Sequence, residues 1–208
     1  DSEKEYFLMI SCLPGTVLPL DLRVIESVTQ RSTFRLSLDP DYLSALAGFH
    51  GGVPESPYLT SCGGDVRQIA WFVSYLDEDS TLSGPFEPAF YYMKNDLRVD
   101  DRSIPAIVND EVCPYFGCER IIPFAALITD GSMPLTLRLY TLDSYPADSL
   151  CFDTSTRPHT VVICDGQRAA EEAVRFDDGD IEDVDYTVFT QPVANSFLDF
   201  TKMLRHDP

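Results

Sequence analysis

Residues 38–56 read LDPDYLSALAGFHGGVPES, and this stretch predicts one helix with both of its ends marked. Asp39 is a suitable N-cap, and Pro40 fits the first helical position, where a missing N–H costs nothing. The glycine pair at 51–52 ends the helix, because glycine tolerates the left-handed conformation of a C-cap. We therefore expect a helix over about 40–50, followed by a sharp turn of the chain.

A second helix is expected near the C-terminus, over 195–204, where Asn195 can serve as the N-cap. Both helices carry apolar residues at helical spacing, so each has one face suited to burial. These faces consist of Tyr42, Leu46 and Phe49 in the first helix and of Phe197, Phe200 and Leu204 in the second. We expect both helices to pack on one sheet.

The other apolar segments predict mainly strands. Residues 149–166 (SLCFDTSTRPHTVVICDG) predict a hairpin, because two apolar runs flank a Thr-Ser-Thr-Arg-Pro turn. Further strands are expected at 6–15, 66–78, 121–131 (a short strand and a turn), 135–142 and 186–194 (a strand or the approach to one). A short helix is expected at 20–30, and one or two helices plus loop within 83–120. The order is no strict alternation of strands and helices. It predicts one α+β domain over 1–208, with a largely antiparallel sheet of about six strands flanked by helices.

Apolar residues make up 44% of the chain, enough for a substantial hydrophobic core despite the high charge. The core is expected between the two helices and the sheet. Its predicted members are Tyr42, Leu46, Trp71, Phe72, Phe124, Cys151, Phe152, Val162, Phe197 and Phe200.

Charge restricts the classes of partner. The chain has 15 Lys and Arg against 34 Asp and Glu, which gives a net charge of −19. Such a field repels nucleic acids and anionic lipids and attracts basic proteins. We therefore expect neither nucleic acid nor membrane as a partner. Solubility is the alternative explanation of this charge.

The sequence shows no sign of export or membrane insertion. No run of about 18 apolar residues is present, so no transmembrane helix is expected. The first residues, DSEKEYFLMISCLPG, lack the basic n-region of a signal peptide. The six cysteines are widely spaced, and two lie in strand-like runs, so reduced core cysteines are expected. These features favour a cytoplasmic protein.

The sequence lacks the common motifs of catalysis and cofactor binding. It contains no G-x-S-x-G elbow, no G-x-G-x-x-G and no P-loop pattern. Cys113 and Cys118 supply half of a zinc site at most, because the other cysteines and the three histidines are scattered singly. An EF-hand loop would need Gly and Glu where the chain has Asp183 and Phe189. We therefore expect a non-enzymatic protein with no catalytic residues, no metal and no cofactor.

Two acidic patches are the candidate partner-binding residues. Six acids fall within 177–185 (DDGDIEDVD), where they repel one another unless a basic group compensates. We expect both patches at strand ends, where binding loops tend to lie. The first patch is Asp77, Glu78 and Asp79, and the second is Asp177, Asp178, Asp180, Glu182, Asp183 and Asp185. A solvated loop without a partner is the alternative for the second patch.

The order of four segments resembles the SUKH superfamily, bacterial immunity proteins related to fungal cell-wall regulators with the same domain. LDPDYLSALAGFHGGVPES is similar to the family's acidic-aromatic helix, which ends in a Gly-Gly turn. VRQIAWFVSYLDED resembles the following strand, and VANSFLDFTKML resembles the C-terminal helix. IIPFAALITDG and SLCFDTSTRPHTVVIC resemble the family's Ile-Pro-Phe-Ala strand and cysteine-aspartate hairpin. The chain departs from the pattern by an extra segment at about 131–149.

The resemblance implies a function without catalysis. Characterised members mostly neutralise a cognate toxin, often a nuclease or a deaminase, and an acidic inhibitor suits a toxin with a positive site. We predict an immunity protein that blocks the active or substrate site of such a toxin in bacterial competition. Two alternatives remain open: a metal-dependent hydrolase that uses the acidic clusters, and a regulatory interaction module without a toxin.

Overall fold

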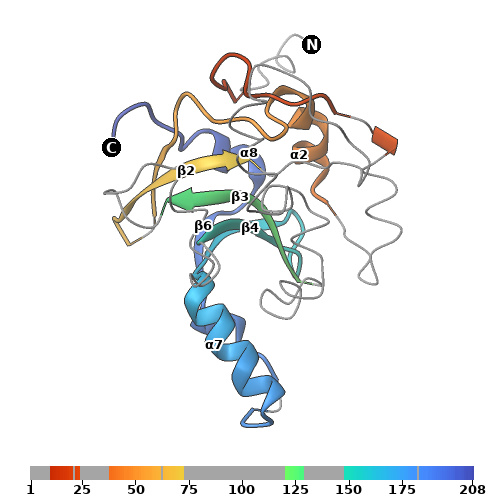
Figure 1. Cartoon of the computed structure of the whole chain (residues 1–208), viewed down its shortest axis with the longest axis vertical. Coiled ribbons are helices and arrows are strands. Elements are labelled where there is room, and N and C mark those ends of the chain that lie inside the picture. Colours follow the sequence, from red (N-terminus) through yellow and green to blue (C-terminus); the bar gives the residue numbers. More distant parts are fainter. Residues whose placement is uncertain are drawn as a thin grey trace, which may run out of the picture.

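One antiparallel sheet organises the part of the chain that the computed structural model describes, which is residues 10–20, 22–23, 38–61, 63–72, 120–128, 148–181 and 183–208. Within these ranges the sheet has six strands in the order β1-β2-β3-β4-β5-β6, so each strand pairs with the next along the chain (Figure 1). The strands are β1 (Tyr58–Thr60), β2 (Val66–Phe72), β3 (Ile121–Ile128), β4 (Ser149–Asp153), β5 (Thr160–Cys164) and β6 (Thr190–Ala194). The predicted α+β class and the antiparallel sheet are confirmed.

The first predicted helix is present but shorter than expected. It is α2 (Pro40–Ala45), and the Asp39 carboxylate accepts hydrogen bonds from the N–H groups of Asp41 and Tyr42 at 2.9 and 3.2 Å. The chain continues as a 3₁₀ turn, η1 (Leu46–Gly48), because helices often tighten in their last turn. The predicted apolar face is still buried, since Tyr42, Leu46 and Phe49 are at most 1% exposed.

The two glycines after this helix serve different purposes. Gly51 has φ +67°, the left-handed conformation that favours glycine. Gly52 lies against the N-terminal segment, and a Cβ built on it would be 2.8 Å from the Sγ of Cys12. The Gly52 carbonyl also accepts a hydrogen bond from the Phe72 N–H at 2.8 Å. The turn therefore connects the helix to the end of β2.

The C-terminal helix is α8 (Phe197–Thr201), and its cap differs from the prediction. Ser196 is the N-cap, and its hydroxyl accepts a hydrogen bond from the Asp199 N–H at 3.1 Å. Asn195 was the wrong choice, because the helix begins at Phe197 and the capping residue directly precedes the first helical residue. Leu204 lies beyond the helix and packs, partly buried, against the core.

An aromatic cluster joins both helices to the sheet. The Tyr42 ring lies 5.3 Å from that of Phe197 and 5.1 Å from that of Phe152, measured between centroids. Phe124 stacks on Phe152 at 4.4 Å. All ten predicted core residues are at most 3% exposed: Tyr42, Leu46, Trp71, Phe72, Phe124, Cys151, Phe152, Val162, Phe197 and Phe200. The packing of both helices on the sheet is thus confirmed.

The predicted hairpin is β4 and β5, and both of its faces are buried. Leu150 and Phe152 belong to the core beneath α2 and α8, whereas Cys151 between them faces the other side of the sheet. There a second cluster forms from Ile121, Cys151, Val162, Cys164, Ala169 and Phe189. Within the described residues, Cys12, Cys151 and Cys164 form no disulfide bond.

The structure contains a helix that we did not predict, α7 (Gly166–Asp177). Its N-cap is Asp165, whose side chain accepts a hydrogen bond from the Arg168 N–H at 3.0 Å. Ala169 and Glu172 are among its buried residues, and neither is a large apolar residue. Figure 1 shows α7 projecting away from the sheet, at the opposite side of the molecule from α2.

Several predicted segments lie wholly or partly outside the described residues. The strand predicted at 66–78 is seen to 72 and that at 121–131 to 128, while 186–194 holds the 3₁₀ turn η3 (Tyr186–Val188) and then β6. In the first predicted strand, Cys12 makes an isolated bridge to Pro54. Outside the described ranges lie 6–9, 135–142, Cys113, Cys118, most of 20–30, 83–120 except Arg120, and the extra segment at 131–149 up to residue 147.

Candidate partner-binding surface

The acids of the second predicted patch follow the end of α7. Asp177 is the last residue of the helix, Asp178 is its C-cap, and Asp185 is the N-cap of η3. We call Asp178, Asp180 and Asp183, which are all exposed, the acidic tip. The strand-end placement of this patch was wrong, because the unpredicted helix α7 precedes it. Asp77, Glu78, Asp79 and Glu182 lie outside the described residues.

The chain reverses beyond α7 in a Schellman motif. The N–H of Asp180 donates to the carbonyl of Arg175 at 2.8 Å, and the N–H of Gly179 donates to that of Phe176 at 3.0 Å. Gly179 has φ +76°, as this motif requires. The motif therefore holds Asp178 and Asp180 directly beyond the helix end.

A buried carboxylate joins α7 to the returning chain. Glu172 is 3% exposed, and its Oε2 accepts a hydrogen bond from the Arg175 guanidinium at 2.7 Å. Its Oε1 accepts a longer hydrogen bond, 3.4 Å, from the N–H of Asp185. A buried charge needs such partners, so Glu172 sets the position of the returning chain beside the helix.

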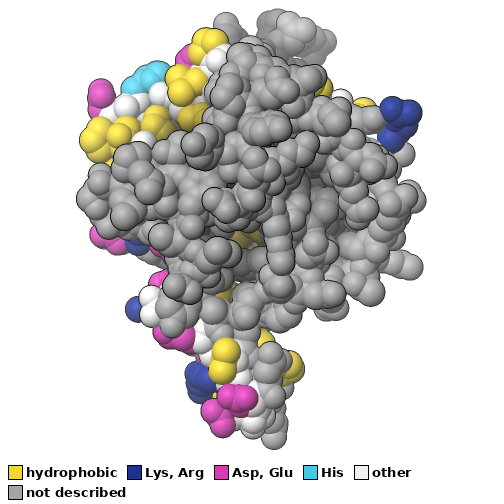
Figure 2. Space-filling view, viewed as in Figure 1, with side chains coloured by type: hydrophobic (Ala, Val, Ile, Leu, Met, Phe, Trp, Pro, Cys, Tyr) yellow, Lys and Arg dark blue, Asp and Glu magenta, His cyan; other side chains and the backbone are white. Residues whose placement is uncertain are grey.

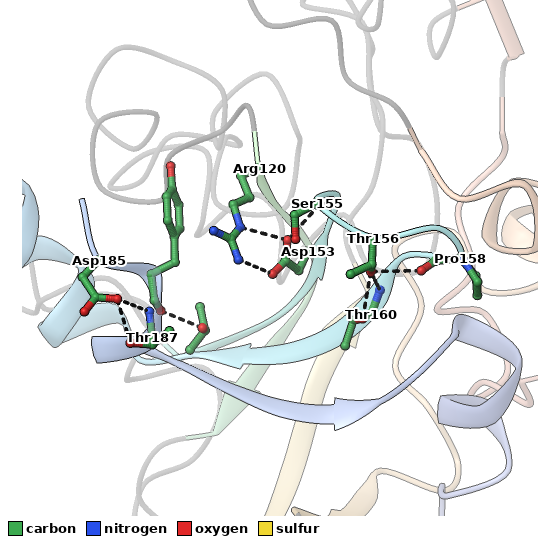
Figure 3. A network of polar contacts seen from close by, with 10 residues as sticks. Arg120, Asp153, Ser155, Thr156, Pro158, Thr160, Asp185 and Thr187 are labelled. Atoms are coloured by element: carbon green, nitrogen blue, oxygen red, sulfur yellow. Dashed lines mark hydrogen bonds and ion pairs between the residues drawn. The ribbon is translucent and has the colours of Figure 1, made fainter. Parts of the chain in front are cut away.

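Asp185 starts the turn that leads back to β6. Its Oδ1 accepts hydrogen bonds from the Thr187 hydroxyl at 2.7 Å and from the Thr187 N–H at 3.0 Å (Figure 3). These bonds lower the pKa of Asp185 from its ordinary value. Asp185 therefore stabilises η3, unlike the acidic tip, whose side chains make no ion pair with any described residue.

Figure 3 also shows the contacts that attach this region to the sheet. Arg120, next to β3, donates to both carboxylate oxygens of Asp153 at 3.0 and 2.8 Å, and its Cζ lies 4.5 Å from the Tyr186 ring centroid. Burial raises the pKa of Asp153, but hydrogen bonds from Arg120 and Ser155 outweigh it and lower that pKa to about 2. The polar groups here satisfy one another, so we assign this network a structural role.

Two apolar side chains are exposed in the last turns of α7. Val174 is 53% exposed and Phe176 is 46% exposed. In Figure 2, hydrophobic side chains lie among acidic and basic ones on the projecting part of the molecule. Our reading of the sequence missed these residues because it missed α7, although Asp165 and Gly179 are suitable signals of the two helix ends.

The described residues include no group of three or more His, Cys, Asp or Glu placed to hold a metal ion. No helix in the described ranges is both long and apolar enough to cross a membrane. Comparison of the chain with protein-family models, curated proteins and solved structures gave no match.

Proposed function

We propose that this protein is a non-enzymatic immunity protein that binds and neutralises a cognate bacterial toxin in the cytoplasm. The toxin would be a basic protein that acts on nucleic acids, a nuclease or a deaminase, and binding would cover its active or substrate site. The order of the four SUKH-like segments supports this proposal, as does the net charge of −19, which suits a partner with a positive site.

The position of the acidic tip carries the proposal. Asp178 and Asp180 follow the C-terminus of α7, where the negative end of the helix dipole is an unfavourable place for acidic side chains. The acids therefore oppose the stability of the free protein. Local features that lower stability tend to occur at functional sites, and a cationic partner would relieve this repulsion.

The proposal is tested with the protein encoded by the gene next to the gene for this chain, taken as the candidate toxin. Replacing Asp178, Asp180 and Asp183 together by Ser should lower the association rate at low salt about tenfold and weaken its salt dependence, because opposite charges steer association. Surface plasmon resonance across a salt series measures both quantities. A toxicity assay shows whether the wild-type chain neutralises the toxin.

The control variant removes the same charge elsewhere by replacing Asp65, Asp199 and Asp207, which are exposed, by Ser. Equal losses in the two variants would show that only net charge matters and that the acidic tip is a solvated surface. If the wild-type chain neither binds nor neutralises the toxin, the proposed function is wrong.

A further inference from the structure

We infer that the end of α7 inserts into a positively charged cleft of the partner, the cleft that otherwise holds nucleic acid. The acidic tip would then take the place of phosphate groups. This inference rests on the proposed function and deepens it, because it states which element binds and in what manner.

The first support is the point at which burial along α7 ends. Ala169, Glu172 and Phe176 are spaced by three and four residues, so they share one side of the helix. Their exposed fractions are 1%, 3% and 46%. Burial along this side therefore ends between Glu172 and Phe176, and the last turn of the helix projects into solvent.

The second support is that apolar side chains are exposed on both sides of this turn. Val174 is two residues from Phe176, so the two side chains point about 200° apart around the helix axis. Val174 is 53% exposed. A flat partner surface would cover only one of them, whereas a cleft that receives the end of the helix covers both.

The charges specify what kind of cleft this is. The acidic tip begins at Asp178, two residues after Phe176, so carboxylates lead into the cleft while Phe176 and Val174 contact its walls. A basic floor with apolar or aromatic walls is typical of sites that hold nucleic-acid strands. A second copy of this chain is a poor occupant, because both copies carry a charge of −19. Anionic membranes are repelled for the same reason.

The first experiment measures the affinity of a Val174→Ser/Phe176→Ser variant for the candidate toxin. We expect a loss of about tenfold or more, mainly through faster dissociation, because buried apolar anchors dominate interface energies. The matched control is Leu13→Ser/Leu198→Ser, which changes two other side chains of 46% and 40% exposure. It should bind within about twofold of the wild type. Circular dichroism verifies that both variants are folded.

The second experiment uses the wild-type chain and needs no substitution. Heparin, a soluble polyanion, should compete with the chain for the toxin, so that the two never bind together. A ternary complex of toxin, heparin and this chain, or unchanged affinity of the Val174/Phe176 variant, would overturn the insertion while leaving neutralisation intact. A wild-type chain that does not bind the toxin would instead refute the proposed function, and the insertion with it.

Discussion

Gly52 is packed so closely that no larger residue fits without movement. A Cβ at this position would lie 2.8 Å from the Cys12 Sγ and 3.2 Å from the carbonyl oxygen of Phe49. The second of these atoms belongs to the backbone and cannot rotate away. The glycine therefore allows the N-terminal segment to pack against the turn after α2.

We predict that Gly52→Ala lowers the free energy of unfolding by about 1–3 kcal/mol, the usual cost of overpacking. A Gly52→Ala/Cys12→Ala chain should recover part of this loss, because the nearest atom is removed. Gly48→Ala is the control, since no atom in the described part of the chain lies within 4 Å of a Cβ built there and alanine favours a helical turn. Urea denaturation measures all three; a Gly52→Ala variant as stable as the wild type would contradict the packing described here.

His159 is a second residue whose surroundings predict a measurable effect. Its side chain is fully buried, and neither ring nitrogen has a hydrogen-bond partner among the described residues. Burial lowers its pKa, and nearby Arg157 lowers it further, whereas Asp39 and Asp153 act in the opposite direction. The fold therefore favours the neutral imidazole.

The sign of the pH dependence follows from that lowered pKa. Above the ordinary histidine value of 6.5 the imidazole is neutral in both states, and as pH falls below it the unfolded chain takes up the proton first. Stability should thus decrease from about pH 7 to about pH 5. The melting temperature measures this effect. It should fall less between these pH values in a His159→Leu variant than in the wild type, whereas His206→Gln, at an exposed site, should leave the fall unchanged. Identical pH slopes for wild type and His159→Leu would argue against the prediction.

At the scale of elements, α7 differs from α2 and α8 in how it is stabilised. The aromatic cluster buries the inner faces of α2 and α8, whereas α7 depends on its caps and on Glu172. An element with few buried apolar contacts opens locally at low free-energy cost. Replacing Gly179, the glycine that follows the helix, should therefore destabilise the end of α7 more than it destabilises the core.

We predict that Gly179→Ala speeds amide hydrogen exchange in the last turn of α7 and leaves global stability nearly unchanged. The cost is backbone strain alone, about 1–2 kcal/mol, because φ is +76° and no atom of the described residues lies within 4 Å of the added Cβ. Gly64→Ala imposes the same strain in the turn between β1 and β2, with φ +86° and an equally open site. That control should lower global stability. A global loss from Gly179→Ala would mean that α7 unfolds together with the sheet.

For the whole molecule, the dominant electrostatic feature is self-repulsion. Net charge far from zero destabilises a compact chain, and salt screens the repulsion between exposed groups. We predict that the melting temperature rises by at least about 2 °C between low salt and about 0.5 M NaCl. The triple acidic-tip variant should rise less, since it carries three fewer negative charges. A melting temperature independent of salt would show that the charges are spaced too widely to interact.

Local patterns predicted the helix start at Asp39, the β4–β5 hairpin and the buried faces of α2 and α8. Each of these depends on residues close together in the chain, such as a cap, a turn or a periodic apolar stripe. Apolar residues recur at helical spacing in the segment of α7, for example Ala169, Ala173 and Phe176, so the sequence held a signal of this helix that our prediction missed. The toxin partner and the SUKH resemblance remain predictions.

Cap residues, turn glycines and apolar spacing were therefore sufficient to predict the fold class. Helix capping, turn formation and apolar periodicity each depend on interactions between residues that are close in the sequence. The arrangement at the end of α7 depends on contacts between distant segments. Glu172 binds the backbone of Asp185, and Arg120 contacts Asp153 and Tyr186. Such contacts determine that α7 extends beyond the sheet and that Phe176 is exposed. A helix face is buried only where other segments of the folded chain pack against it.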